Sequence, residues 1–249
     1  MGQSDKPTGY EFSELARAYY VFLANGFEVD VASPKGGAAP IVIDDNDMGT
    51  YDYAFLNDPV AQSKINVTLE IEKVNPEEYQ ALYFVGGKGA MFDFPKNLTL
   101  QKLIAQYIER GKVVGAVCHG PAALVNVTLS NGSHLLKGKK ISSFTNEEEL
   151  FLIPDALELF PFMLQDKLIE QGATFQEGTM YLENVAIDGK LVTGQNPWST
   201  WLVAESMIKQ LEQSYAVRDK QDLLAMCALQ FAAKSEQIVI DDSVDVEQA

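Results

Sequence analysis

The chain has 249 residues, of which 47% are hydrophobic, which is enough for one large α/β domain with a substantial core and rules out wholesale disorder. It carries 19 Lys and Arg against 35 Asp and Glu, a formal net charge of −16, so its surface repels phosphate backbones and anionic lipids, and we expect neither nucleic acid nor a membrane as a partner. Two cysteines and two histidines exclude a disulfide scaffold and leave few candidates for a metal site.

The apolar periodicity predicts helices that alternate with strands. Near the start we expect a polar loop up to residue 8, a helix over 14–25, a strand over 28–33, a turn over 34–40, and acidic loops with one short helix over 41–64. Further along we expect strands over 81–85, 113–117, 139–144, 184–188 and 191–193, and helices over 98–110, 122–129, 160–171 and 199–213.

This alternation predicts a three-layer α/β/α sandwich with a central, mainly parallel sheet. We expect residues 1–213 to form one such domain. Residues 214–249, helical and then acidic, are expected to pack on the same domain or to form an oligomer contact. No apolar run approaches the ~20 residues that span a bilayer, and the start of the chain lacks the apolar stretch of a signal peptide. Together with free thiols, this favours the cytoplasm.

A cysteine–histidine pair lies at the junction of a predicted strand and a predicted helix. Cys118 and His119 directly follow the strand over 113–117, and Pro121 suits the first turn of the helix. A nucleophile on such a turn projects from the carboxyl end of the sheet, where the helix N-terminus lowers a thiol pKa and offers N–H groups to an oxyanion. The alternative interpretation is an inert core thiol.

Paired glycines leave the neighbouring strand at the same end of the sheet. Gly86 and Gly87 follow the strand over 81–85, where glycines allow backbone N–H groups to approach a ligand oxygen closely. A plain tight turn is the alternative. The pattern is not a dinucleotide fingerprint, because the third glycine and the following strand-end acid are missing.

A cysteine–histidine pair also needs a carboxylate that orients the histidine. Glu147, Glu148 and Glu149 follow the strand over 139–144, and the pattern does not choose among them or exclude a solvated helix start. Glu14, in the first turn of the first helix, is by pattern alone a residue that caps or solvates that turn.

Taken together, these segments resemble the ThiJ/PfpI superfamily and, within it, the heat-shock chaperone and glyoxalase III branch. The resemblance implies a flavodoxin-like fold of the class I glutamine amidotransferase type. The segments that carry it appear in family order and are TGYEFSELARAYYVFLANGFEVDVASPKGG (8–37), YFVGGKGAMFDFP (83–95), GKVVGAVCHGPAAL (111–124), GKKISSFTNEEE (138–149) and DGKLVTGQNPWS (188–199).

The resemblance also implies roles for individual residues. Cys118 matches the nucleophile and His119 the histidine beside it. The triad acid falls on Glu149, with Glu148 as the fallback, and Glu14 matches a carboxyl group that hydrogen-bonds to the nucleophilic sulfur. Gly87 and the backbone of His119 match the oxyanion donors. The expected oxyanion- or substrate-binding residues are Gly86, Gly87, Lys88 and Gly120.

The chain departs from the family pattern in three ways. Lys88 stands where the family commonly has a histidine, which bears on substrate preference. Some relatives hold zinc with extra histidines, and this sequence has none to spare, so we expect no metal and no cofactor. The strand that precedes the TGY segment in the family has no counterpart, so either the chain is shortened or the sheet edge is built differently, for example by residues 237–241.

The function implied by the resemblance is a glutathione-independent glyoxalase, a lyase of the D-lactate dehydratase type. It converts methylglyoxal or a related 2-oxoaldehyde into a 2-hydroxy acid, with protein or nucleotide deglycation as a possible extension. The first alternative is a stress-protective holdase chaperone or a redox sensor, which an oxidisable thiol would suit. The second is a cysteine amidase or peptidase. We expect a small aldehyde as substrate and a homodimer as the assembly.

Overall fold

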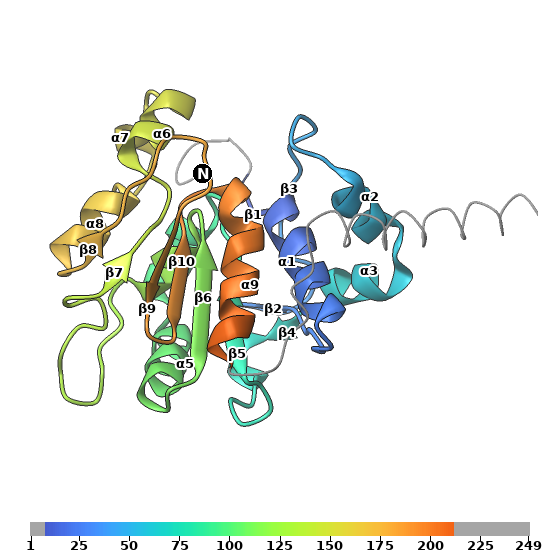
Figure 1. Cartoon of the computed structure of the whole chain (residues 1–249), viewed down its shortest axis with the longest axis horizontal. Helices are drawn as coiled ribbons and strands as arrows, with labels where there is room; N and C mark the ends of the chain where they lie inside the picture. The colour runs from blue at the N-terminus through green and yellow to red at the C-terminus, as the bar shows by residue number, and fades with distance from the viewer. Residues whose placement is uncertain (1–7, 212–249) are drawn as a thin grey trace, which may run out of the picture.

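The computed structural model describes residues 8–211, and its centre is a four-stranded sheet (Figure 1). The strand order is β5 (Ala81–Phe84), β6 (Val113–Val117), β10 (Leu191–Gly194) and β9 (Val185–Asp188). The first three strands run parallel, and β9 pairs antiparallel with β10. The mainly parallel sheet that the sequence predicted is confirmed.

Helices cover both faces of this sheet. Helices α1 (Phe12–Ala24) and α9 (Thr200–Gln210) pack on one face, and Figure 1 shows α9 running alongside β6. Helix α5 (Leu98–Glu109) packs against β6 from the other side. Val113 and Val117 of β6 belong to the core on the α1 side, whereas Val114 and Ala116 belong to the core on the α5 side. This alternation explains why β6 reads as a continuous apolar run.

The stretch over 41–64 holds two helices where the sequence analysis expected loops and one short helix. They are α2 (Thr50–Asn57) and α3 (Pro59–Asn66). Asp58 separates them, because its carboxylate accepts from the backbone N–H of Val60 and Pro59 occupies the first turn. The ring of Phe55 in α2 packs edge-on against Phe12 and Tyr19 of α1, which joins α2 to the core.

Two predicted strands are shorter than expected. Of 28–33 only β2 (Ala32–Ser33) is a strand, paired with β4 (Leu69–Glu70), and of 139–144 only β7 (Lys140–Ile141), paired with β8 (Thr174–Phe175). A strand exists only where a neighbour accepts its backbone hydrogen bonds, and among the described residues only these pieces find one. A further short pair joins β1 (Tyr10–Glu11) to β3 (Ile41–Val42). The alternative edge strand over 237–241 and the extension over 214–249 lie outside the described residues.

The helix predicted over 122–129 is wrong. A 3-10 helix, Gly120–Leu124, takes its place, and it stops because Val125 is extended and Asn126 adopts a φ of 66°. The helix expected over 160–171 shortens to α8 (Leu164–Glu170). The remaining described helices are α4 (Ala90–Asp93), α6 (Asn146–Leu152), α7 (Ala156–Leu159) and the 3-10 turns Ile71–Lys73, Phe94–Lys96 and Pro197–Ser199. Over residues 8–211, none of the helices combines the length and apolar character needed to cross a bilayer.

Gly120 should be intolerant of a side chain. A Cβ at Gly120 would lie 2.3 Å from the carbonyl oxygen of Phe84, which belongs to the backbone of β5 and has little room to move. We expect Gly120→Ala to lower the free energy of unfolding by about 1–3 kcal/mol, measured by urea denaturation. Gly49→Ala is the matched control, because its Cβ would meet only an Asp52 oxygen at 3.7 Å. Equal losses in both variants would contradict the close approach.

Candidate active site

The backbone of Cys118 is held at the end of β6 in a strained conformation. Its φ is 58°, a left-handed value that is uncommon outside glycine. Its N–H donates to the carbonyl oxygen of Gly194 at 2.9 Å, and its own carbonyl oxygen accepts from Phe144 at 2.9 Å. Neighbouring segments on both sides therefore fix the turn that carries the sulfur.

His119 links the sulfur of Cys118 to a carboxylate. The Sγ atom of Cys118 lies 3.3 Å from Nδ1 of His119, and Nε2 of His119 lies 2.6 Å from Oε2 of Glu149. The imidazole packs against the ring of Phe144, with 4.7 Å between the ring centroids. All these side chains are buried, so water does not compete for the hydrogen bonds.

The three acids at the start of α6 have different surroundings in the structure. Glu148 forms a capping box with Thr145, and its Oε1 atom accepts from the Tyr181 N–H and from the side-chain amide of Asn196. Those bonds occupy its carboxylate fully. Glu147 is exposed. Only Glu149 pairs with His119.

Glu14 lies inside the site and does not serve the helix start. Its side chain is 0% exposed, and its Oε2 atom accepts from the Gly86 N–H at 2.6 Å. Its carboxyl group also lies close enough to the Cys118 thiol for each to shift the pKa of the other. The pattern-based interpretation of Glu14 as a solvated first-turn acid is therefore wrong. Helix α1 therefore brings a buried carboxyl group to the neighbourhood of the sulfur.

Burial governs the protonation of this pair. Burial raises the pKa of Glu14 well above its ordinary value, and burial followed by the nearby Glu14 charge raises the pKa of Cys118. Two negative charges in this buried space would repel each other, so the ionisation of one group disfavours ionisation of the other. The expectation that a helix N-terminus lowers the thiol pKa is wrong, because burial outweighs the short 3-10 turn that follows. Cys118 is 4% exposed, which also disfavours an exposed redox-sensing thiol.

The glycines allow the elements of the site to touch. A Cβ at Gly86 would lie 2.6 Å from the Val117 carbonyl oxygen and 2.7 Å from the Glu14 carboxylate. Gly87 has a φ of 90°, and its N–H hydrogen-bonds to the Cys118 sulfur, so it points at the reactive atom. The expected substrate contact Lys88 is half-buried, and its charge acts on Glu11.

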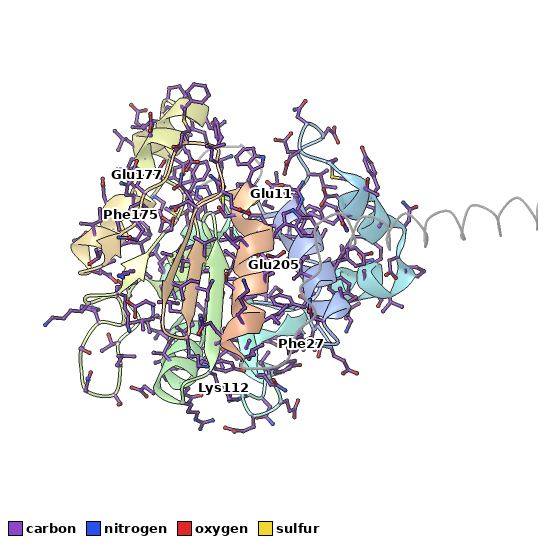
Figure 2. The ribbon with its side chains drawn as sticks, in the orientation of Figure 1. Glu11, Phe27, Lys112, Phe175, Glu177 and Glu205 are labelled. Carbon is purple, nitrogen blue, oxygen red and sulfur yellow. The ribbon has the colours of Figure 1, made fainter. Side chains whose placement is uncertain are left out.

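The sequence analysis missed Glu11, a second carboxyl group near the sulfur. Figure 2 shows Glu11 at the upper end of the view and Lys112, which precedes β6, at the lower end, so Glu11 lies at the carboxyl end of the sheet. Burial, followed by the charges of Asp47 and Asp44, raises the pKa of Glu11 to about 7. The charge of Glu11 in turn raises the pKa of Glu14. Its place three residues before Glu14 was the signal available in the sequence.

No group of three or more His, Cys, Asp or Glu side chains is arranged to hold a metal ion within residues 8–211. The carboxylates of the site already bind backbone amides, the histidine or the thiol. The arrangement can therefore provide a nucleophile, an imidazole oriented by an acid, and a buried proton carrier.

Glu11 should make folding stability depend on pH. Its folded pKa of about 7 exceeds the unfolded value near 4.5, so the folded state holds an extra proton between these values and stability falls as pH rises through this window. We expect Glu11→Gln to gain about 1–3 kcal/mol over wild type near pH ~8.5 and almost nothing near pH ~4. Urea denaturation at both pH values measures this. A gain that is the same at both would contradict the raised pKa.

Comparison with known proteins agrees with this geometry. The model of the DJ-1/PfpI family matches residues 7–210. Glyoxalase 3 of Candida albicans is 31% identical over 83% of this chain and 91% of its own length, and the glutathione-independent glyoxalase hsp3102 of Schizosaccharomyces pombe is 32% identical over 83% and 90%. Among solved structures, the Francisella tularensis Rapid Encystment Protein 24 kDa matches with a TM-score of 0.80 and 34% identity over 85% of this chain and 93% of that one. Glyoxalase III from Candida albicans matches with a TM-score of 0.73 and 28% identity over 88% and 93%. The strand–cysteine–histidine turn, the buried first-helix glutamate and these matches together place the chain in the DJ-1/PfpI family.

Proposed function

We propose that this protein is a glutathione-independent glyoxalase, which converts a 2-oxoaldehyde such as methylglyoxal into a 2-hydroxy acid. The observation that carries the proposal is that two buried proton carriers interact with the Cys118 sulfur, the His119 imidazole at 3.3 Å and the Glu14 carboxyl group. An aldehyde bound at the sulfur therefore has two groups close by that can add or remove a proton. The names of the similar proteins support the same chemistry.

In the first step the Cys118 thiolate adds to the aldehyde carbon C1 and forms a hemithioacetal. The new C–S bond uses a sulfur electron pair, and the former aldehyde oxygen takes a proton. The Gly87 N–H, which points at the sulfur, lies where it can stabilise the negative charge that develops on this oxygen. His119, held by Glu149 at 2.6 Å, exchanges the proton of the thiol.

In the second step the Glu14 carboxylate removes the hydrogen on C1 as a proton. The C–H electrons form a C1=C2 double bond, and the ketone oxygen takes a proton, which gives an enediol. Return of a proton to C2 and loss of the proton on the C1 oxygen produce a thioester of the 2-hydroxy acid. Burial raises the pKa of Glu14, which makes its carboxylate a stronger base toward the hydrogen on C1.

In the last step water hydrolyses the thioester, which releases the 2-hydroxy acid and the Cys118 thiol. The net reaction adds one water molecule. C1 is oxidised while C2 is reduced within the same substrate, so the balance needs no external electron carrier. We further propose that the protein acts in the cytoplasm, where its thiols would stay reduced, and as a homodimer.

Replacement of the site residues should remove lactate formation. We expect Glu14→Gln to lower kcat for methylglyoxal by about a hundredfold or more, because the amide keeps the Gly86 contact but cannot carry the proton. We expect Cys118→Ser to lower it further. The measurement is D-lactate and L-lactate formed without glutathione.

The matched control for these variants is Glu147→Gln, because Glu147 is an exposed acid of the same helix that carries Glu149. It should retain wild-type turnover. Normal lactate formation by Glu14→Gln would exclude Glu14 as the proton carrier, and its absence in the wild-type protein would exclude the glyoxalase function.

The enediol step predicts isotope exchange with solvent. In D₂O the proton that reaches C2 has exchanged on the Glu14 carboxyl group, so lactate should carry deuterium at C2, detected by mass spectrometry and NMR. Lactate that retains only the original hydrogen at C2 would instead indicate direct hydride transfer from C1, and Glu14 would then have no role as a base.

A further inference from the structure

An open cleft of about 340 Å³ lies at the carboxyl end of the sheet, outside the residues assigned to the reaction. Helix α1, the loop before β9, the 3-10 turn Pro197–Ser199 and the first turn of α9 build it. In Figure 1 α9 begins at the upper end of the view, the end at which the β6 arrow points. The lining residues are Arg17, Tyr181, Leu182, Glu183, Trp198 and Trp201.

Two structural links run from the walls of this cleft toward Cys118. Ser199, next to Trp198, packs so closely on Gly194 that a Cβ at Gly194 would lie 2.8 Å from the Cβ of Ser199. Gly194 is also the residue whose carbonyl oxygen accepts from the Cys118 N–H. On another wall, Arg17 follows Glu14 by about one turn of α1.

Aromatic rings form much of the wall, and their positions are fixed by contacts behind them. The rings of Tyr181 and Trp198 meet edge to face with centroids 5.2 Å apart, and Trp201 packs on Tyr51 at 4.7 Å. Trp198 is nevertheless 41% exposed, so one part of this large apolar ring is uncovered.

The loop that carries Tyr181 is tied to the helix of the triad acid. The Tyr181 N–H donates to Oε1 of Glu148, and the Asn196 side-chain amide donates to the same oxygen and to the Leu182 carbonyl oxygen. Glu148 is adjacent in sequence to Glu149, the partner of His119. The cleft wall and the reaction site therefore share one hydrogen-bonded support, which keeps the wall in place before a ligand arrives.

The charges on the walls do not favour an ionic ligand. The Arg17 guanidinium contacts Asp52 at 3.0 Å and Asp47 at 3.1 Å, so two carboxylates already neutralise the one basic side chain of the lining. A flat uncharged group between aromatic side chains gains stacking and apolar burial without losing a hydration shell.

We propose that this aromatic cleft binds the substituent on C2 of the substrate and that the substituent it fits is a planar aromatic ring. The inference rests on the proposed glyoxalase function and names its substrate class as aryl-substituted 2-oxoaldehydes. The aldehyde carbon reaches Cys118 while the ring lies against Trp198. A methyl group leaves the same cleft empty and gains none of these contacts.

The kinetic test compares phenylglyoxal with methylglyoxal. We expect wild type to have a higher kcat/KM for phenylglyoxal, and Trp198→Ala to lower the ratio of the two kcat/KM values by about tenfold, since one aromatic contact contributes on this order. Trp198→Phe should restore most of the ratio. Leu157→Ala, which truncates a 70% exposed apolar residue of α7 outside the lining, is the matched control and should keep the wild-type ratio. A ratio unchanged in Trp198→Ala would overturn the inference.

A binding test separates this inference from the proposed reaction. The chain contains two tryptophans, and both line the cleft, so intrinsic tryptophan fluorescence reports its occupancy directly. 2-Hydroxyacetophenone should quench this fluorescence saturably in wild type and in Cys118→Ser, and hydroxyacetone, which has a methyl group in place of the ring, should not. N-acetyltryptophanamide corrects for light absorbed by the ketone.

The kinetic test and the binding test together show whether the glyoxalase function or the aromatic subsite is wrong. Saturable quenching by the aryl ketone without turnover of either aldehyde would overturn the glyoxalase function and leave an aryl-binding cleft. Turnover of methylglyoxal with no aryl quenching and no preference for phenylglyoxal would overturn the aromatic subsite and leave the glyoxalase function. Thermal unfolding followed by circular dichroism checks that Trp198→Ala is folded. If it is not, the wild-type comparison decides, because quenching by 2-hydroxyacetophenone equal to that by hydroxyacetone would by itself overturn the aromatic subsite.

Discussion

The burial of two ionisable groups, Cys118 and Glu14, beside each other is the constraint on which the rest of the site depends. Both groups are buried, and burial raises the pKa of each, so neither can be ionised independently of the other. The two groups interact electrostatically, and the Gly86 N–H holds Oε2 of the carboxyl group at 2.6 Å. Removal of either partner would leave a buried ionisable group without its counterpart, a costly state. The fold must therefore keep α1 and the end of β6 in contact.

Close backbone approach is what keeps them in contact. Gly86 leaves no room for a Cβ between the Val117 carbonyl oxygen and the Glu14 carboxylate, and Gly120 approaches the Phe84 carbonyl oxygen in the same way. The glycines thus bring the ends of β5 and β6 and the first turn of α1 together around one sulfur atom. The left-handed φ of Cys118, strained for a residue with a side chain, persists because Gly194 and Phe144 hold its backbone from both sides.

The sequence predicts those structural features that depend only on residues adjacent in the chain. Val113–Val117 followed by Cys118 and His119 is such a local pattern, and the structure keeps it. The strand expected over 28–33 shrinks to Ala32–Ser33, because strand length depends on a partner strand that no local pattern specifies. The helix expected after Pro121 becomes a 3-10 turn, since the chain must bend at Asn126.

The local sequence pattern also could not predict which of Glu148 and Glu149 pairs with His119. Adjacent helical residues point about 100° apart, so only one of them can face His119, and the capping box with Thr145 decides which. The direction of the Cys118 pKa also depends on burial by distant segments, among them α1. By contrast, the family resemblance placed Glu14 beside the sulfur, where the pattern of its own helix predicted a solvated acid.

Glu148 and Glu149 connect the reaction site with the cleft proposed to bind the substrate. Glu149 orients the imidazole, while Glu148 holds Tyr181 and Asn196, which support the wall of the cleft beyond the sulfur. One short helix, α6, therefore positions both the proton-transfer group and the surface proposed to bind the substituent. A shift of α6 would move the two together, so substrate fit and histidine orientation cannot vary independently in this fold. Specificity at the cleft is in this way tied mechanically to the geometry of the Cys118–His119 pair.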